Sequence, residues 1–248
     1  KYNFNKENQQ IYISKSKVTK FFENKEIINS LYKKSKIKPN AFPKNITKKN
    51  NFISYNFIKG KTLYNHYDKH NFKSLIYFLE KNLWNEKINQ TKDFKTNCKN
   101  FYFKKTYERI DMFLKKNKFL DNQKLIFKKI KLIRVKKILN NINWVEILNG
   151  IPKFIHGDLQ FDNILKTSKK QFKLIDWRPT FGKSVTVGDI YYDYAKLLGG
   201  LYINYDLVKQ NKFLFKLENK KLRLEIPNRK NSKKLIDFFE NYLKKKKI

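Results

Sequence analysis

Apolar residues recur with two different spacings along the first 150 positions of the chain. Short apolar or alternating runs predict strands at residues 10–14 and 52–57. Apolar residues three and four positions apart predict helices, which we place at residues 18–32, 71–89, 100–118 and 124–140. This part of the chain is therefore expected to contain a little β structure followed by many helices.

The pattern changes after Pro152, where short apolar runs are separated by glycine, aspartate and asparagine. These runs predict small strands with polar turns at residues 154–155, 164–165 and 172–175. The remaining elements are a helix, a hairpin and a last helix, predicted at residues 190–202, 213–226 and 232–243. No repeat or long linker interrupts the chain, so we expect an α+β protein of one domain or two closely joined lobes.

The composition shows a strong excess of positive charge. The 248 residues include 57 Lys and Arg against 21 Asp and Glu, which gives a formal net charge of +36. Such a charge is typical of proteins that bind nucleic acids or anionic membranes. Only five basic residues are arginines, however, and the chain is rich in Asn, Ile, Phe and Tyr, as expected from an A- and T-rich genome. We favour compositional bias over selected polyanion binding and do not expect a nucleic-acid partner.

Cysteine content and hydropathy indicate the compartment. Cys98 is the only cysteine, which excludes an intrachain disulfide and a four-cysteine zinc site. No run of about 18 apolar residues predicts a membrane span, and residues 1–10 are polar rather than signal-like. We therefore expect a cytoplasmic protein. The sequence begins with Lys1 and not with methionine, so we expect that it lacks an N-terminal piece.

The acidic residues are unevenly distributed. Five aspartates and three of the seven glycines fall within residues 157–193. Carboxylates in turns after short strands favour a site for a divalent cation and phosphate groups, because hard cations take oxygen ligands. We therefore expect the chemistry of the protein to lie in this segment.

A specific motif stands in the same segment. Residues 155–165 read IHGDLQFDNIL, and residues 174–177 read LIDW. The order H-G-D, N and then an aspartate after two apolar residues resembles the catalytic loop and metal-binding segment of the aminoglycoside phosphotransferase and choline kinase superfamily, which is related to the protein kinases. The resemblance implies a protein-kinase-like, two-lobed α+β fold. Residues 1–58 would form a truncated, β-rich nucleotide-binding lobe, and residues 59–248 a larger, mainly helical catalytic and acceptor-binding lobe.

The resemblance implies a role for each polar residue of the motif. Asp158 would be the catalytic base, since a carboxylate in a loop can accept the proton of an incoming hydroxyl. Asn163 would assist catalysis and bind Mg²⁺ through its amide oxygen, and Asp176 would be the main metal ligand. ATP and Mg²⁺ are therefore the expected cofactors. His156 is expected to be a structural hydrogen-bonding residue, and Asp162 is expected to cap its loop.

The resemblance also implies a nucleotide site in the N-terminal lobe. Lys15 would contact the phosphates with Glu26 as its acidic partner, and the segment of Tyr55 and Phe57 would hold the adenine. The alternatives are Glu23 as the acidic partner and Lys17 or Lys20 as the lysine.

A glycine-rich phosphate loop is missing from the predicted N-terminal lobe. The first glycine is Gly60, so we expect such a loop upstream of Lys1, with residues 1–4 forming one strand of its hairpin. If the protein had no such loop, its affinity for a nucleotide would be in doubt.

The acceptor site is expected from residues near the motif. Trp177 and Arg178 directly follow the metal-binding aspartate, and Asp193 and Arg109 lie on predicted helices nearby. Asp189 is expected to cap the helix that carries Asp193. This combination is most similar to bacterial phosphotransferases of surface-polysaccharide assembly, which implies a sugar or an amino alcohol such as choline as the acceptor.

Two functions remain in competition. We expect an ATP- and Mg²⁺-dependent kinase that transfers the γ-phosphate to a hydroxyl of a small molecule. The alternative is a non-catalytic kinase-like binding module, which the intact set of Asp158, Asn163 and Asp176 disfavours. A protein kinase is not expected, because no Ala-Pro-Glu segment and no recognisable activation loop follow Asp176.

Overall fold

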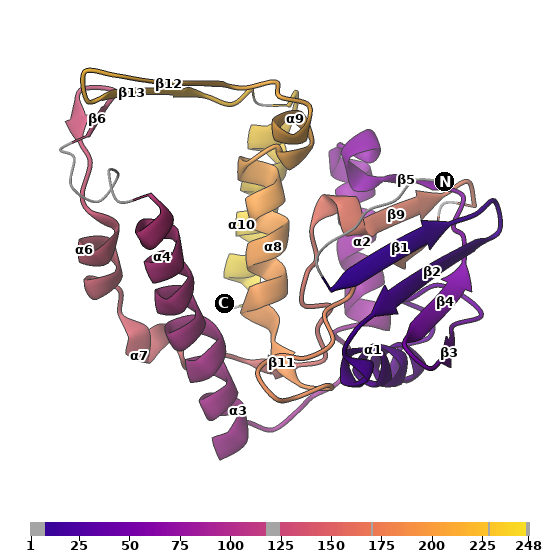
Figure 1. Cartoon of the computed structure of the whole chain (residues 1–248). Coiled ribbons are helices and arrows are strands. Elements are labelled where there is room, and N and C mark those ends of the chain that lie inside the picture. Colours follow the sequence, from indigo (N-terminus) through magenta and orange to yellow (C-terminus); the bar gives the residue numbers. More distant parts are fainter. Residues whose placement is uncertain (1–7, 118–124, 170, 228, 247–248) are drawn as a thin grey trace.

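The structure is a computed structural model and describes residues 8–117, 125–169, 171–227 and 229–246. The chain is a mixed α+β protein, as predicted. Figure 1 shows the N-terminal sheet at one side, helices α8 (Ile190–Tyr202) and α10 (Ser232–Lys245) in the middle, and further helices at the other side. The strand predicted at residues 1–4 lies outside the described residues.

Four antiparallel strands form the N-terminal sheet in the order β1-β2-β4-β3. Their bounds are Gln9–Ile13 (β1), Lys17–Phe22 (β2), Thr47–Lys49 (β3) and Phe52–Asn56 (β4). Lys20 of the inner strand β2 pairs in register with Ile11 on one side and Ile53 on the other. Its side chain is buried, on the same face of β2 as Val18.

The predicted helix at residues 18–32 was wrong at its start. Residues 17–22 form β2, because the β-branched and aromatic side chains of this run pack well between two neighbouring strands. Helix α1 (Lys25–Ile37) begins only after Asn24, whose side chain accepts a hydrogen bond from the main-chain N–H of Glu26. The correction places Lys20 on a strand.

Helix α1 packs on the N-terminal sheet and is tied to the predicted catalytic segment by Trp177. The indole Nε1 of Trp177 donates a hydrogen bond to the main-chain oxygen of Leu31 at 2.9 Å. Its ring packs against Phe42 and Tyr55, with centroid separations of 4.7 and 6.0 Å. Because Trp177 is only 4% exposed, it acts mainly as a packing contact between α1, the sheet and the segment after β10 (Phe172–Leu174).

Helices α2 (Lys69–Asn82), α8 and α10 share the same hydrophobic core. The rings of Phe72 and Phe239 meet edge to face at 5.5 Å, and Leu197 is fully buried. Helix α2 ends at Asn82, before the predicted end at residue 89.

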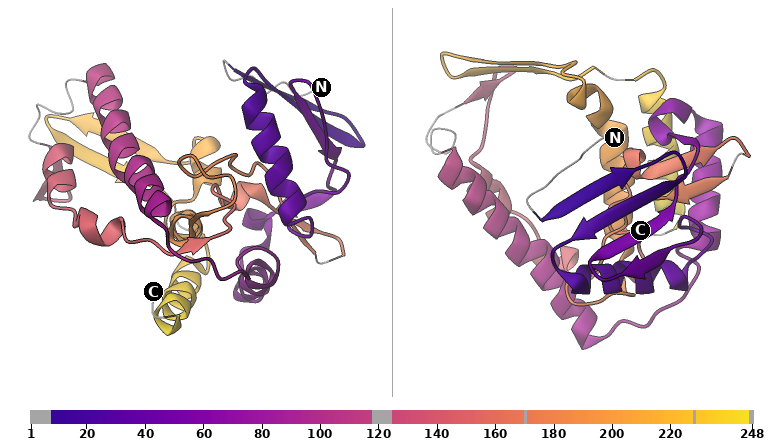
Figure 2. Two further views of the ribbon diagram at one scale, coloured as in Figure 1. Left: turned by 90° about the horizontal axis from the view of Figure 1, so that it is seen from below. Right: turned by 45° about the vertical axis from the view of Figure 1, so that its right-hand side comes forward.

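Helices α3 (Lys92–Cys98), η2 (Lys99–Lys104) and α4 (Lys105–Lys116) follow one another along the chain, and η2 is a π-helical segment. π-helical turns are frequent at functional sites. Here the segment carries Phe101 into a second core cluster with Phe181. Figure 2 shows from below that α4 and the N-terminal sheet lie on opposite sides of α8.

The predicted helix at residues 124–140 was also wrong in its first half. The segment contains β6 (Ile126–Phe127), β7 (Ile130–Lys131) and only then α6 (Val135–Asn140), followed by α7 (Trp144–Ile147). Strand β6 pairs in parallel with β13 (Lys221–Glu225) of the predicted hairpin, whose other strand is β12 (Leu214–Glu218). Strand β6 has only two residues and its partner lies far along the chain, so the local sequence pattern does not indicate this pairing. Figure 1 shows the hairpin reaching from α9 (Tyr205–Lys209) to β6.

Two small antiparallel sheets hold the loops of the motif. Strands β5 (Gly60–Thr62), β9 (Ile164–Thr167) and β10 form one of them, with the short helices η1 (Leu63–His66) and η3 (Phe161–Asn163) beside it. Strands β8 (Pro152–Lys153) and β11 (Gly188–Asp189) form the other, and Asp189 caps α8 as predicted. Within the described residues, no helix is long and apolar enough to cross a membrane.

Candidate active site

A cleft of about 640 Å³ lies between the N-terminal sheet and the loops that follow β8 and β10. The sheet and α1 contribute Gln9, Ile11, Lys20, Phe22, Leu31, Ile53 and Tyr55. The opposite wall consists of Asp158, Gln160, Asp162, Asn163, Asp176, Trp177, Arg178, Pro179 and Lys209. The polar residues of the sequence motif therefore face a cleft whose other wall is largely apolar.

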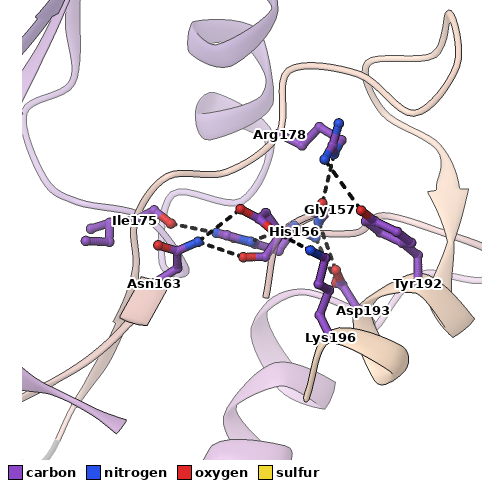
Figure 3. A network of polar contacts seen from close by, with 9 residues as sticks. His156, Gly157, Asn163, Ile175, Arg178, Tyr192, Asp193 and Lys196 are labelled. Atoms are coloured by element: carbon purple, nitrogen blue, oxygen red, sulfur yellow. Dashed lines mark hydrogen bonds and ion pairs between the residues drawn. The ribbon is translucent and has the colours of Figure 1, made fainter. Parts of the chain in front are cut away.

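The loop of residues 155–163, called here the catalytic loop after its predicted role, turns sharply at Gly157, whose φ is +82°. A Cβ at this position would lie 2.8 Å from the Cβ of Arg178, so both the left-handed backbone and the close approach require glycine. After the turn, the amide Nδ2 of Asn163 donates to the main-chain oxygen of Asp158 at 2.8 Å and to its Oδ2 at 3.3 Å. These contacts, drawn in Figure 3, hold Asp158 and leave the amide oxygen of Asn163 available as a ligand.

His156 lies beneath this loop with its ring fully buried. Its Nε2–H donates to the main-chain oxygen of Ile175 at 3.0 Å, and its Nδ1 accepts from the main-chain N–H of Asp158 at 3.2 Å. Burial, with the nearby Lys34 ammonium, lowers the pKa of His156 to about 3. The imidazole is therefore neutral at physiological pH and connects the two loops of the motif.

The carboxylate of Asp193 on α8 supports the same loop from inside the protein. Its oxygens accept hydrogen bonds from the main-chain N–H groups of His156 and Gly157, both at 2.8 Å, and from the indole Nε1 of Trp84 at 3.1 Å. Burial raises the pKa of Asp193, whereas these donors and the Lys34 ammonium favour its charged form. Figure 3 shows Asp193 below Gly157.

Asp176 ends the segment after β10 with a left-handed backbone, at a φ of +57°. This conformation costs free energy for a residue other than glycine, and it is common at functional positions. The carboxylate forms an ion pair with Lys20 across the cleft. The residue before Asp176 is linked to the catalytic loop, because the main-chain N–H of Ile175 donates to the main-chain oxygen of Asn163 at 2.9 Å.

Arg178 and Lys196 border the catalytic loop on its other side. The Nε–H of Arg178 donates to the main-chain oxygen of Gly157 at 2.9 Å, and its main-chain oxygen accepts from the buried Nζ of Lys34 at 3.0 Å. Lys196 of α8 forms an ion pair of 2.9 Å with Asp158. Lys196 therefore contacts the predicted base itself, and Arg178 contacts the residue before it.

The structure brings most of the predicted cleft residues together and leaves others apart. Asp158, Asn163, Asp176, Tyr55, Trp177 and Arg178 line the cleft. Lys15 does not reach it, because it lies in the exposed turn between β1 and β2. Lys20, one of the alternatives, lines the cleft from the N-terminal sheet.

The other predicted residues lie outside the cleft. Glu26 lies in the exposed first turn of α1. Phe57 does not line the cleft, and its main-chain N–H donates to the main-chain oxygen of Ser16 at 2.8 Å. Asp193 is fully buried and so cannot touch an acceptor, and Arg109 lies on an exposed part of α4.

Sequence reasoning missed three lysines near the site: Lys34, Lys105 and Lys196. In a chain with this many lysines, no composition signal separates them from the rest. The position of Lys34 could have been suspected, because it follows Ile28 and Leu31 on the apolar face of α1. Burial lowers the pKa of Lys34 to about 7.

The buried His156 predicts a pH dependence of stability. The pKa of histidine is about 6.5 in an unfolded chain and about 3 for His156 in the folded protein. The unfolded state therefore binds the proton first as the pH falls. We expect the free energy of unfolding to decrease by up to about 1.4 kcal/mol per pH unit below 6.5.

Urea denaturation between pH 7 and pH 5 checks this expectation. His156→Gln should flatten the slope, whereas His70→Gln, at an exposed position on α2, should leave it as in the wild type. Parallel slopes for the wild type and His156→Gln would contradict the assignment.

No protein-family model matches this sequence, and no curated protein matches it. Solved structures do show similarity in fold. The complex of APH(2")-IIa with streptomycin and ATP is 15% identical, with 77% of this chain and 67% of that chain covered at a TM-score of 0.47. The ADP-bound aminoglycoside phosphotransferase APH(2'')-Ib is 16% identical over 80% and 69%, with a TM-score of 0.48. The gentamicin complex of APH(2")-IIa is 15% identical over 96% and 75%, with a TM-score of 0.49. The chain is structurally similar to aminoglycoside phosphotransferases at low sequence identity.

Proposed function

We propose that this protein is an ATP- and Mg²⁺-dependent small-molecule kinase that transfers the γ-phosphate to a hydroxyl of a sugar or an amino alcohol. The observation that carries the proposal is the meeting of Asp158, Asn163, Asp176 and Lys20 in one cleft. Carboxylates, an amide oxygen and an ammonium group are the groups that phosphoryl transfer requires, because the protein contributes mainly positioning and charge stabilisation.

Asp158 is the proposed catalytic base. Its carboxylate accepts the proton of the acceptor hydroxyl as the hydroxyl oxygen forms a bond to the γ-phosphorus and the bond from that phosphorus to the bridging oxygen of ADP breaks. The products are ADP, a phosphate monoester and one proton. The two hydrogen bonds from Asn163 and the ion pair with Lys196 hold Asp158 in the cleft for this role.

The residues present fit a Mg²⁺ ion that is shared with a nucleotide. The carboxylate of Asp176 and the amide oxygen of Asn163 are hard oxygen ligands on one wall of the cleft. The described residues contain no group of three or more His, Cys, Asp or Glu side chains that could hold a metal. Two protein ligands are the usual number where phosphates complete the shell, and the ion would neutralise phosphate charge.

The apolar wall suits a nucleotide base. Ile11, Ile53 and Tyr55 of the sheet and Leu31 of α1 line the cleft opposite the catalytic loop. Lys20 lies between this wall and Asp176, where an ammonium can contact phosphate oxygens. We propose that residues 1–58 form the nucleotide-binding lobe and residues 59–248 the catalytic and acceptor-binding lobe, and that the product serves surface-polysaccharide assembly.

The first test is Mg²⁺-dependent ATP binding by calorimetry, followed by ATP consumption with choline, ethanolamine, simple sugars and aminoglycosides. We expect Asp176→Asn to weaken Mg²⁺-ATP binding by at least about tenfold, because a charge-assisted contact of about 1.5–3 kcal/mol is lost. Asp162→Asn is the matched control, since Asp162 lines the same cleft and is also paired with a lysine, Lys209, but is not a proposed metal ligand.

Each result decides between the two candidate functions. Mg²⁺-dependent binding that is lost in Asp176→Asn and kept in Asp162→Asn, with turnover of one acceptor, would support the kinase. Absence of both ATP binding and turnover would favour a non-catalytic binding module.

A further inference from the structure

Three cations gather on two aromatic rings beside Asp158. The Nζ of Lys105 lies 4.0 Å from the ring centroid of Phe101. The guanidinium of Arg178 lies 5.2 Å from Phe101 and 5.7 Å from Tyr192, and the Nζ of Lys196 lies 5.6 Å from Tyr192. The two rings meet edge to face at 4.8 Å. We call Lys105, Arg178 and Lys196 the cationic cluster; they come from three separate segments of the chain. Figure 3 shows Arg178, Tyr192 and Lys196 around the catalytic loop.

The positive charge of the cationic cluster is only partly balanced. Lys196 is paired with Asp158, whereas Lys105 makes no ion pair with any residue that the structure describes. Burial and the neighbouring charges of Arg178, Arg109 and Lys196 lower the pKa of Lys105 to about 8, and Asp158 acts in the opposite direction. The environment of Lys105 is therefore short of negative charge.

The cationic cluster begins where the acceptor must bind. Asp158 and Arg178 both line the cleft, and the proposed base has to contact the acceptor hydroxyl. The nucleotide phosphates are assigned to the other part of the cleft, near Lys20 and Asp176. An acceptor that extends from Asp158 toward η2 and α8 therefore meets Lys105, Arg178 and Lys196, which would repel an ammonium group and attract an anion.

We propose that the acceptor is an anionic hydroxyl compound, whose phosphate or carboxylate group is bound by the cationic cluster while its hydroxyl faces Asp158. This inference rests on the proposed kinase function and narrows its acceptors to negatively charged ones, which excludes an amino alcohol such as choline. Planar guanidinium and ammonium groups together are well suited to phosphate and carboxylate oxygens. The aromatic rings of Phe101 and Tyr192 hold the cations in place through cation–π contacts.

Acceptors that share one carbon skeleton test the charge directly. ATP consumption is measured with glucose, glucosamine, glucose 6-phosphate and gluconate in the presence of Mg²⁺. We expect kcat/KM for an anionic member to exceed that for the neutral and cationic members by about tenfold or more, the factor that one additional charge-assisted contact supplies. The comparison of phosphate with carboxylate identifies the anion. Turnover of the neutral or cationic member at an equal or higher kcat/KM would overturn the inference and leave the kinase function standing.

Lys105→Met tests the cluster itself, with Lys104→Met as the matched control because Lys104 is the exposed neighbour on η2. Lys105 is chosen because, within the part of the chain that the structure describes, it forms no hydrogen bond or ion pair with Asp158 or with the main chain of the catalytic loop. Lys105→Met should raise the acceptor KM by about tenfold without raising the KM for ATP. An acceptor KM that is the same in Lys105→Met and Lys104→Met would contradict the proposal.

A binding measurement covers the case in which none of the four compounds is turned over. The protein is saturated with Mg²⁺ and a non-hydrolysable ATP analogue, so that the nucleotide phosphates are in place, and is titrated with inorganic phosphate and with acetate by calorimetry. Binding of either anion that weakens in Lys105→Met but not in Lys104→Met supports an anionic acceptor subsite. No binding, or binding that is unchanged in Lys105→Met, refutes it, and failure of the analogue itself to bind refutes the kinase function together with the inference.

Discussion

Replacement of Asp158 by asparagine is expected to lower acceptor turnover by about 10²- to 10⁴-fold, the usual contribution of a positioned general base. The asparagine side chain has the same shape but cannot accept the proton of a hydroxyl. The loop should keep its form, because the shorter hydrogen bond from Asn163 goes to the main-chain oxygen of Asp158 and not to its side chain. Mg²⁺-ATP binding should therefore change little, in contrast to Asp176→Asn.

Single-turnover phosphoryl transfer and calorimetric ATP binding separate the two effects. Asp162→Asn again serves as the control, since it removes a carboxylate from the same cleft at a position paired with Lys209. If Asp158→Asn reduced ATP binding and turnover equally, or if both remained near wild-type values, Asp158 could not be the base.

The core of the candidate site could be predicted because it is local in sequence. Asp158, Asn163 and Asp176 lie within 19 consecutive positions, and short strands connect them. The strand after Asn163 and the return strand β10 form one antiparallel pair, which brings the segment before Asp176 back beside Asn163. The order of these residues along the chain therefore brings them close together, while Asp193 and Lys196 of α8 support the loop from outside the motif.

The N-terminal part was harder to predict, because strand pairing decided its structure. Residues 17–22 carry apolar side chains that suit a helix as well as a strand, and only the two neighbouring strands make the run a strand. The choice between Lys15 and Lys20 depended on that assignment. Since Lys20 shares the buried face of β2 with Val18, an alternating interpretation of this run would have selected it.

Contacts with distant parts of the chain account for the remaining differences between the predicted and the observed roles of site residues. Trp177 and Arg178 follow Asp176, the predicted metal ligand, so sequence alone suggested contact with the acceptor. The structure shows that both residues line the cleft. Trp177 also donates a hydrogen bond to the main-chain oxygen of Leu31 and packs in the aromatic core, and Arg178 also donates one to the main-chain oxygen of Gly157. These additional contacts could not be predicted from the sequence, because the partners of Trp177 and Arg178 on α1 and η2 lie about 70 to 150 positions earlier in the chain.

Removal of the Asp193 carboxylate is expected to have the largest effect on stability. Asp193→Ala would leave the main-chain N–H groups of His156 and Gly157 and the indole N–H of Trp84 without their acceptor. An orphaned buried donor costs about 1–3 kcal/mol, so we expect the free energy of unfolding to fall by at least about 3 kcal/mol. Lys34 would also lose the nearby negative charge that favours its ammonium form.

Urea denaturation at pH 7 measures this loss, and Asp237→Ala, at an exposed position on α10, is the control, with an expected change of less than about 0.5 kcal/mol. Two of the three donors belong to the catalytic loop and the third to Trp84, just after the end of α2, whereas their acceptor lies on α8. The carboxylate therefore also fixes the position of Asp158. The folded fraction of Asp193→Ala should therefore show reduced turnover even under conditions that keep it native. A variant with wild-type stability would mean that other groups hold the loop, and a destabilised variant with full turnover per folded molecule would mean that Asp193 stabilises the fold without positioning the base.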